Sequence, residues 1–187
     1  MIRSLTRFRK DSRGIAAIEM AFIMPFLLFL YFGLVDLTAM ISLNRKVTYA
    51  ASVVADLVTQ NNSTVTSANI DDYVKAIELV MKPTTINSVR VEVYMFRKVS
   101  GTPKAKWRKF SPGGSICGTP SSSGMDPLMT DSNDLIVGVV CTKYTPYIAT
   151  FLGKSILGAT TFHMTEQIAL RPRQSTTLDC ATCSQMN

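Results

Sequence analysis

Residues 13–36 read RGIAAIEMAFIMPFLLFLYFGLVD, an apolar stretch in which Glu19 is the only charge between Arg13 and Asp36. As a helix with a rise of about 1.5 Å per residue, its roughly 20 apolar residues cross a hydrocarbon core about 30 Å thick. This length predicts a membrane span over about residues 15–36 rather than a buried core helix. A carboxylate inside a span is costly, so Glu19 needs a partner, a function or a route to the headgroups by snorkelling.

The flanks of the span predict its orientation. The preceding segment is basic, with Asp11 as its only acidic residue; its basic residues are Arg3, Arg7, Arg9, Lys10 and Arg13. Such an excess marks the cytoplasmic side, so we expect a cytoplasmic N-terminus and a periplasmic C-terminal body. A cleaved secretory signal peptide is the competing interpretation, but the small-x-small site expected after the apolar run is missing.

A family resemblance lies in the same stretch. Gly14, Ile15 and then Glu19 resemble the Gly-x-x-x-x-Glu processing site of type IV prepilins and pseudopilins. The longer segment RFRKDSRGIAAIEMAFIMPFLLFLYFGLVDLTAM is similar to the N-terminus of the TadE family of tight-adherence (Flp) pilus assembly proteins. That family typically carries a basic leader, R-G-x-A-A-x-E, a Leu-Pro-type break and F-G-x-x-E/D. The resemblance covers about residues 7–60 and departs at Met20, where an aromatic residue is common.

The resemblance implies a minor pilin or pseudopilin-like role in a bacterial inner membrane. A prepilin peptidase would cut between Gly14 and Ile15, Glu19 would serve maturation and subunit registry, and Pro25 and Gly33 would shape the helix for packing. The implied partners are the peptidase, membrane lipid, the major pilin, other minor pilins and the inner-membrane platform. Cleavage would free the α-amine of Ile15, whose ordinary pKa near 8 leaves it mostly protonated and able to neutralise Glu19.

The sequence of the remaining residues predicts an α+β domain after the membrane span, and we expect the following organisation. Residues 1–14 form a basic leader, 15–60 a long helix, 61–173 an exported domain and 174–187 a polar tail. Helical spacing of apolar residues predicts that the first helix continues beyond the membrane to about residue 60, and that a second helix, capped by Ser67 or Asn69, ends near Met81. We expect this second helix to pack on an antiparallel sheet of about four strands.

Alternation and apolar runs locate those strands. Residues 89–96 alternate as a strand with one buried face, and a turn at Gly101–Pro103 leads into a strand over 104–110. Residues 135–144 are apolar on both faces, which is typical of a central strand, and a last strand covers about 159–170. We expect a long surface loop over 111–133 and an apolar turn over 148–153.

The four cysteines, Cys117, Cys141, Cys180 and Cys183, all lie on the expected exported side, where an oxidising compartment favours disulfides. Of three possible pairings we favour Cys117–Cys141 with Cys180–Cys183. The spacing Cys180-Ala181-Thr182-Cys183 also occurs in redox motifs, which leaves a periplasmic thiol-redox protein as an alternative, although redox dithiols normally sit at a helix N-terminus.

Other chemistry is not indicated. KAKWRKF (104–110) would suit nucleic acid or anionic lipid, yet an edge strand guarded by lysines explains it better. Much of the net charge of +7 comes from the leader, so no nucleic-acid partner is expected. His163, the only histidine, is predicted to face solvent. We expect no cofactor, no metal and no enzymatic activity. A membrane-anchored binding or adhesion module that is never processed is the main alternative function.

Overall fold

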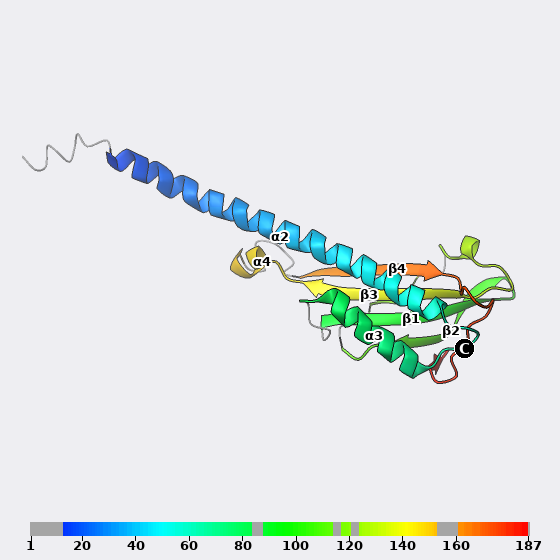
Figure 1. Cartoon of the computed structure of the whole chain (residues 1–187). Helices are drawn as coiled ribbons and strands as arrows, with labels where there is room; N and C mark the ends of the chain where they lie inside the picture. Colours follow the sequence, from blue (N-terminus) through cyan, green and yellow to red (C-terminus); the bar gives the residue numbers. More distant parts are fainter. Residues whose placement is uncertain (1–12, 84–87, 114–116, 121–123, 153–160, 187) are drawn as a thin grey trace, which may run out of the picture. The chain divides into compact units, whose positions relative to one another are not determined.

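The structure is a computed structural model, which describes residues 13–83, 88–113, 117–120, 124–152 and 161–186. The chain divides into two compact units (Figure 1). The first unit consists of Met1–Met40 with Pro146–Thr160, and the second of Ile41–Thr145 with Thr161–Asn187. A long apolar N-terminal helix, a further helix and an antiparallel sheet confirm the predicted α+β fold class.

Helix α2 covers Arg13–Thr59 as one continuous element that contributes to both units. Pro25 lies in its interior. Proline removes one backbone donor, and membrane helices tolerate that loss better than soluble ones do. Beyond the apolar stretch the sequence has no glycine or proline up to Thr59, so nothing in it stops the helix before the polar residues that follow.

The first unit contains the N-terminal part of α2 and the short helix α4, Tyr147–Leu152. The sequence predicts an apolar turn over 148–153 here, and the structure shows a helix that starts one residue earlier. Residue 153 lies outside the described part of the chain.

The second unit is built on a five-stranded antiparallel sheet with the order β4-β3-β1-β2-β5. The strands are β1 Val89–Val99, β2 Thr102–Phe110, β3 Leu135–Tyr144, β4 Phe162–Leu170 and β5 Ser184–Gln185. The prediction that residues 135–144 form an interior strand is confirmed, because β3 pairs with both β1 and β4. The fifth strand comes from the polar tail and pairs with β2 at Trp107 and Arg108. Of the strand expected over 159–170, residues 159 and 160 lie outside the described part.

The second half of α2 and helix α3, Ser67–Met81, cover one face of this sheet (Figure 1). α2 crosses β3 at Gly138, where a Cβ atom would lie 2.8 Å from Val54 Cγ1 and 3.0 Å from the carbonyl oxygen of Ala51. The close approach therefore requires a residue without a side chain. The buried α2 residues on this side are Val47, Ala50, Ala51, Val54, Ala55 and Val58.

The opposite face of the sheet is buried too, which corrects two expectations. A second apolar cluster consists of Tyr94, Phe96, Met125, Met129, Leu135, Val137 and Val139. β1 therefore has two buried faces rather than one, because its aromatic residues face this cluster. The two methionines flank the short 3-10 helix η2, Asp126–Leu128. The segment predicted as a surface loop thus supplies the cover for this face.

Two local boundaries differ from those expected. The N-cap of α3 is Thr66, whose hydroxyl accepts the backbone N–H of Asn69 at 3.2 Å. The hairpin between β1 and β2 turns at Ser100 and Gly101, both with positive φ, as a two-residue type I′ turn requires. Thr102 and Pro103 accordingly belong to β2 and not to the turn.

Candidate functional site

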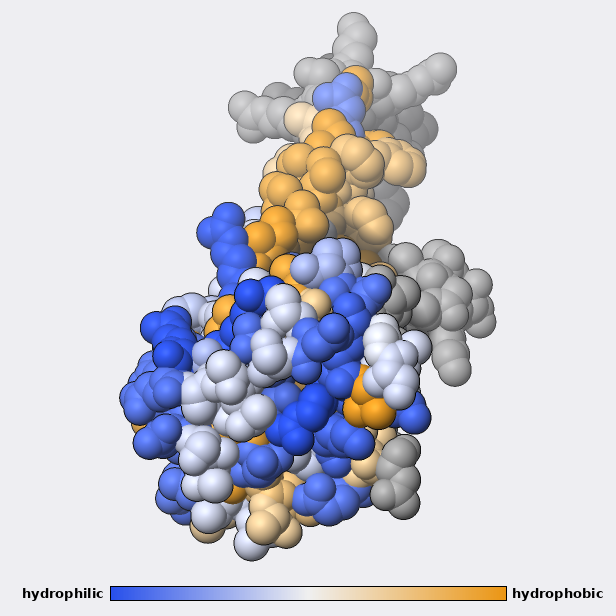
Figure 2. All heavy atoms as spheres, turned by 90° about the vertical axis from the view of Figure 1, so that its right-hand side faces the viewer, coloured by the Kyte–Doolittle hydropathy of each residue, from blue (hydrophilic) through white to orange (hydrophobic). Residues whose placement is uncertain are grey.

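The N-terminal part of α2 presents an exposed apolar surface that is interrupted only by Glu19. All residues from Gly14 to Phe32 are exposed, and the most apolar 18-residue window has a mean hydropathy of 2.2. Figure 2 shows hydrophobic residues gathered over this helix, whereas the visible face of the second unit is mostly hydrophilic. By length and composition, this is the one helix of the described chain that is a candidate membrane span.

The residues of the predicted processing site lie at the start of this helix. Gly14 is the second residue of α2, and a Cβ atom built on it would meet nothing within 4 Å. Ile15 and Glu19 are both exposed and, four residues apart, lie on the same side of the helix. Among the described residues, no side chain covers the position of a Cβ at Gly14. The predicted basic leader lies outside the described residues, except for Arg13 and Gly14.

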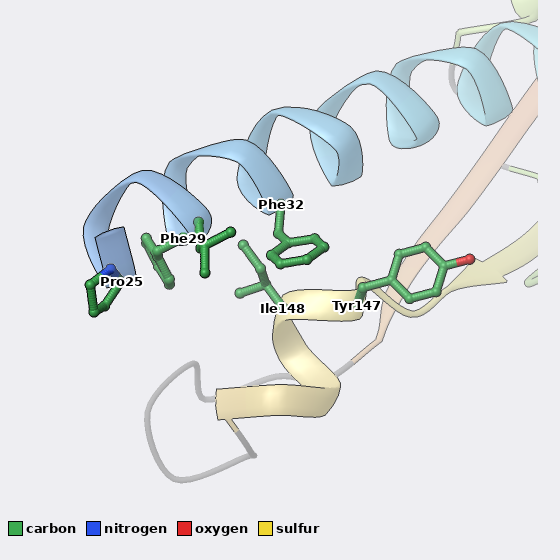
Figure 3. A pocket seen from close by; sticks show the side chains of 6 residues that line it. Pro25, Phe29, Phe32, Tyr147 and Ile148 are labelled. Atoms are coloured by element: carbon green, nitrogen blue, oxygen red, sulfur yellow. The ribbon is translucent and has the colours of Figure 1, made fainter. Parts of the chain in front are cut away.

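An apolar groove follows further along the helix. Pro25, Leu28, Phe29 and Phe32 recur at three- and four-residue spacing and so form one stripe of α2. Together with Tyr147 and Ile148 of α4 they line a groove of about 470 Å³. In Figure 3, Ile148 lies opposite Phe29 and Phe32, while the Tyr147 hydroxyl points away from Pro25.

Asp36 holds α4 beside α2. Its Oδ1 accepts the backbone N–H of Tyr147 at 2.9 Å, and its Oδ2 accepts that of Ile148 at 2.8 Å. These are first-turn amides of α4, which have no partner within their own helix. Gly33 faces Ile148 at the same contact, and a Cβ atom there would lie 3.5 Å from Ile148 Cδ1, an ordinary contact distance, so the contact does not depend on glycine. The carboxylate is itself buried.

Sequence reasoning missed this arrangement. It placed Pro25 and Gly33 in the helix as packing residues but assigned no role to Asp36, Tyr147 or Ile148. The one available signal was the Phe32-Gly33-Leu34-Val35-Asp36 pattern, which marks an acidic residue at the end of the apolar run. The pattern does not name the segment that the acid contacts, since that segment follows more than a hundred residues later.

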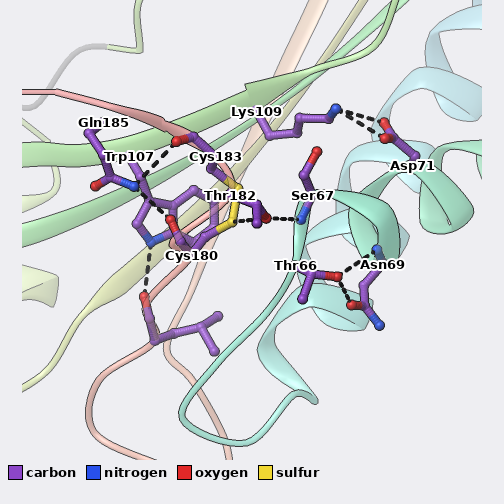
Figure 4. Close-up of a disulfide and its surroundings, with 11 residues drawn as sticks. Thr66, Ser67, Asn69, Asp71, Trp107, Lys109, Cys180, Thr182, Cys183 and Gln185 are labelled. Atoms are coloured by element: carbon purple, nitrogen blue, oxygen red, sulfur yellow. Dashed lines mark hydrogen bonds and ion pairs between the residues drawn. A yellow bond between two sulfur atoms is a disulfide. The ribbon is translucent and has the colours of Figure 1, made fainter.

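In the second unit the four cysteines form the favoured pairs, Cys117–Cys141 and Cys180–Cys183. The first disulfide joins the 111–134 segment to β3. The second lies in the tail near the start of α3, where Thr182 Oγ1 accepts the backbone N–H of Ser67 at 2.7 Å (Figure 4). Cys180 is only 2% exposed. Thiol–disulfide exchange needs access to a sulfur, so this burial favours a structural disulfide over a redox dithiol.

The basic stretch KAKWRKF forms most of β2, and two of its side chains make internal contacts. Trp107 is buried and donates its Nε1–H to the carbonyl of Leu178 at 3.0 Å, which fixes the tail (Figure 4). Lys109 pairs with Asp71 of α3 at 3.0 Å. β5 pairs with β2 only at Trp107 and Arg108. The rest of β2 forms the edge of the described sheet, as the alternating lysines of the sequence predict. His163 is exposed on β4.

Two buried carboxylates organise the second unit. Asp134 accepts two hydrogen bonds from Arg97, both at 2.7 Å, and a third from the backbone N–H of Leu178. The hydrogen bond to Asp134 raises the pKa of the Arg97 guanidinium above its ordinary value. Glu92 accepts the Tyr94 hydroxyl at 2.7 Å. Burial, and secondly this hydrogen bond, raise the pKa of Tyr94 to about 12.

Comparison with known families supports the resemblance predicted from the sequence. Residues 14–56 match the model of the family described as TadE-like protein. The match begins at Gly14, covers the apolar part of α2 and ends three residues before the helix does. No curated protein and no solved structure matches the chain. The matched segment indicates a component associated with the tight-adherence pilus.

Proposed function

We propose that this protein is a minor pilin or pseudopilin-like component of tight-adherence pilus biogenesis, which a prepilin peptidase processes after Gly14. The observation that carries the proposal is the exposed apolar helix that begins at Gly14 and Ile15, contains Glu19 and matches the TadE-like family. A surface of this size is unstable in water, so it belongs in lipid or against other apolar helices.

Processing would give Glu19 a physical role. Cutting after Gly14 creates an ammonium group on Ile15, one helical turn before the carboxylate. At the same membrane depth the two charges neutralise each other within one helix end or between neighbouring subunits, which offsets the cost of a carboxylate in the span. Glu19 then sets the axial position of one subunit against the next.

The protein works by assembly and has no catalytic turnover of its own. The apolar helix anchors it in the inner membrane with the N-terminus in the cytoplasm, and the disulfide-bonded second unit lies in the periplasm. Its partners are the prepilin peptidase and the other pilus components, namely the major pilin, further minor pilins and the membrane platform. Two disulfides in the second unit suit an oxidising compartment.

The test is intact mass and N-terminal sequencing of the membrane-extracted protein from cells with and without the prepilin peptidase. We expect a chain that starts at Ile15 in the first case and at Met1 in the second. Gly14→Val should block cutting, because its side chain stands where the peptidase must approach the backbone. Gly33→Ala is the matched control on the same helix, since its Cβ makes only an ordinary contact with Ile148.

A Met1 start in every strain would exclude the processing step. The membrane-anchored binding or adhesion module would then be the better account of the same helix and body. The thiol-redox alternative is tested separately by replacing Cys180 and Cys183 together. Loss of folding or assembly without loss of any reductase activity would remove it.

A further inference from the structure

We propose that α4 is a second membrane-contacting element, and that the groove between α2 and α4 holds an acyl chain of a phospholipid in the periplasmic leaflet. The inference rests on the membrane span of the proposed function but not on processing or on any pilus partner. Two features carry it: the position of the groove along α2, and the way in which Asp36 satisfies the start of α4.

The groove lies at the depth of the distal leaflet. At about 1.5 Å per residue, Pro25 lies about 16 Å beyond Gly14 along the helix axis, and Phe32 about 27 Å beyond it. A hydrocarbon core is about 30 Å thick. Asp36, about 33 Å beyond Gly14, then comes at the boundary with the headgroups. The first amides of α4 bind Asp36, so α4 begins at this boundary. Its residues Tyr147 and Ile148 line the groove that extends into the outer leaflet.

An acyl chain fits the chemistry of this groove. All six lining residues present apolar surface, and a groove of this kind excludes water because water finds too few polar partners there. The α2 stripe is continuous with the rest of the exposed apolar helix, which contacts acyl chains wherever no protein covers it. The same lipid environment therefore extends into the groove without a break.

The start of α4 is prepared for the boundary between headgroups and hydrocarbon. Free N–H groups at a helix start are costly in lipid, and irregular backbone at membrane depth needs protein partners. The Asp36 carboxylate supplies them for Tyr147 and Ile148. The Tyr147 ring is 71% exposed, and its hydroxyl points away from Pro25, along the direction in which α2 leaves the span (Figure 3). Tyrosine at this level is typical of membrane interfaces, with the ring in lipid and the hydroxyl at the headgroups.

The experiment is a spin-label accessibility measurement on the full chain in nanodiscs of phosphatidylethanolamine and phosphatidylglycerol. All four native cysteines are in disulfides, so one introduced cysteine is the only free thiol of the oxidised protein. We would label Tyr147→Cys, with Phe22→Cys as the lipid control and Tyr49→Cys as the water control. The three native side chains are similarly exposed, at 71%, 79% and 60%. Oxygen reports lipid, and a water-soluble nickel chelate reports solvent.

We expect the label at 147 to have greater access to oxygen than to nickel, as at Phe22, but by a smaller ratio because it lies near the headgroups. The label at 49 should show the reverse. A label at 147 that behaves like the one at 49 overturns the proposal while the span stands. Nickel access at Phe22 overturns the span itself. A label at 147 closed to both reagents means that a protein neighbour, such as a second copy, fills the groove, and this outcome also overturns the lipid assignment.

Adding Asp36→Ala tests the role of the carboxylate. Without it, two amides at the start of α4 lose their acceptor, so the label at 147 should shift from oxygen access toward nickel access. The label at Phe22 should not change in the same variant. An unchanged readout at 147 would overturn the role assigned to Asp36.

Discussion

Gly138 leaves no room for a methyl group in the second unit. In Gly138→Ala the new Cβ would lie 2.8 Å from Val54 Cγ1 and 3.2 Å from the Ala55 side chain, while a backbone carbonyl blocks a third direction. Overpacking of this kind lowers the free energy of unfolding by about 1–3 kcal/mol. Urea denaturation in detergent measures the loss. Gly124→Ala, which meets nothing within 4 Å, is the control and should unfold like the wild type.

Tyr94 makes the stability of the second unit depend on pH in the alkaline range. The fold favours the neutral phenol, because the ring is buried and its hydroxyl donates to the Glu92 carboxylate, and the pKa rises to about 12. An unfolded tyrosine has a pKa of about 10, so this stabilisation is complete below about pH 10 and is lost as the pH rises through 12. By near-ultraviolet absorbance, the wild type should show an ionisation step near pH 12 that belongs to Tyr94. Tyr94→Phe should remove that late step; an unchanged titration would contradict the assignment.

At the scale of elements, the periodicity of apolar residues was sufficient to predict a helix or strand wherever the element carries that periodicity in its own sequence. The apolar run of α2, the stripe Ile70, Val74, Ile77 and Met81 on α3, and the apolar strand β3 are visible in the sequence and present in the structure. β1 was interpreted with one buried face, because the polar neighbours Arg90 and Glu92 suggested solvent. Its second face is covered by Met125 and Met129, whose own segment carries no periodic signal. Strand β5 has only two residues, which is too short for an alternating pattern that would predict a strand.

The two disulfides should differ in their effect on stability. Cys117–Cys141 closes a loop with a sequence separation of 24, and Cys180–Cys183 one of 3. In the chain-entropy account, closing such loops is worth about 3.5 kcal/mol and about 1.9 kcal/mol respectively. The Cys117→Ala/Cys141→Ala double variant should therefore lose more in the urea unfolding midpoint than the Cys180→Ala/Cys183→Ala variant. Equal losses of stability, or a larger loss in the Cys180→Ala/Cys183→Ala variant, would contradict this order. They would show that the contacts made by the tail contribute more to stability than the loop entropy does.

At the scale of the whole molecule, the chain separates an apolar helix from a cross-linked body. The candidate processing site could be proposed from the sequence alone, because the spacing from Gly14 to Glu19 is local and lies next to a charge boundary. The groove was not, because it depends on Asp36 meeting Tyr147 and Ile148, and no sequence pattern specifies that pairing. The disulfide pairing follows sequence proximity in both cases, which is why it could be favoured in advance.

Replacing Glu19 should therefore separate folding from assembly. Glu19 is exposed on the span, far along α2 from the core of the second unit, so Glu19→Ala should leave the thermal unfolding midpoint in detergent unchanged. Incorporation into sheared pili or pilus complexes, followed by immunoblot, should fall sharply, because the proposed function assigns to this charge the axial position of the subunit. Glu78→Ala removes a carboxylate from α3 that is also exposed, and it should leave both measurements unchanged. Normal incorporation of Glu19→Ala, or a lowered unfolding midpoint, would contradict a role in registry and direct attention to the second unit as the assembly surface.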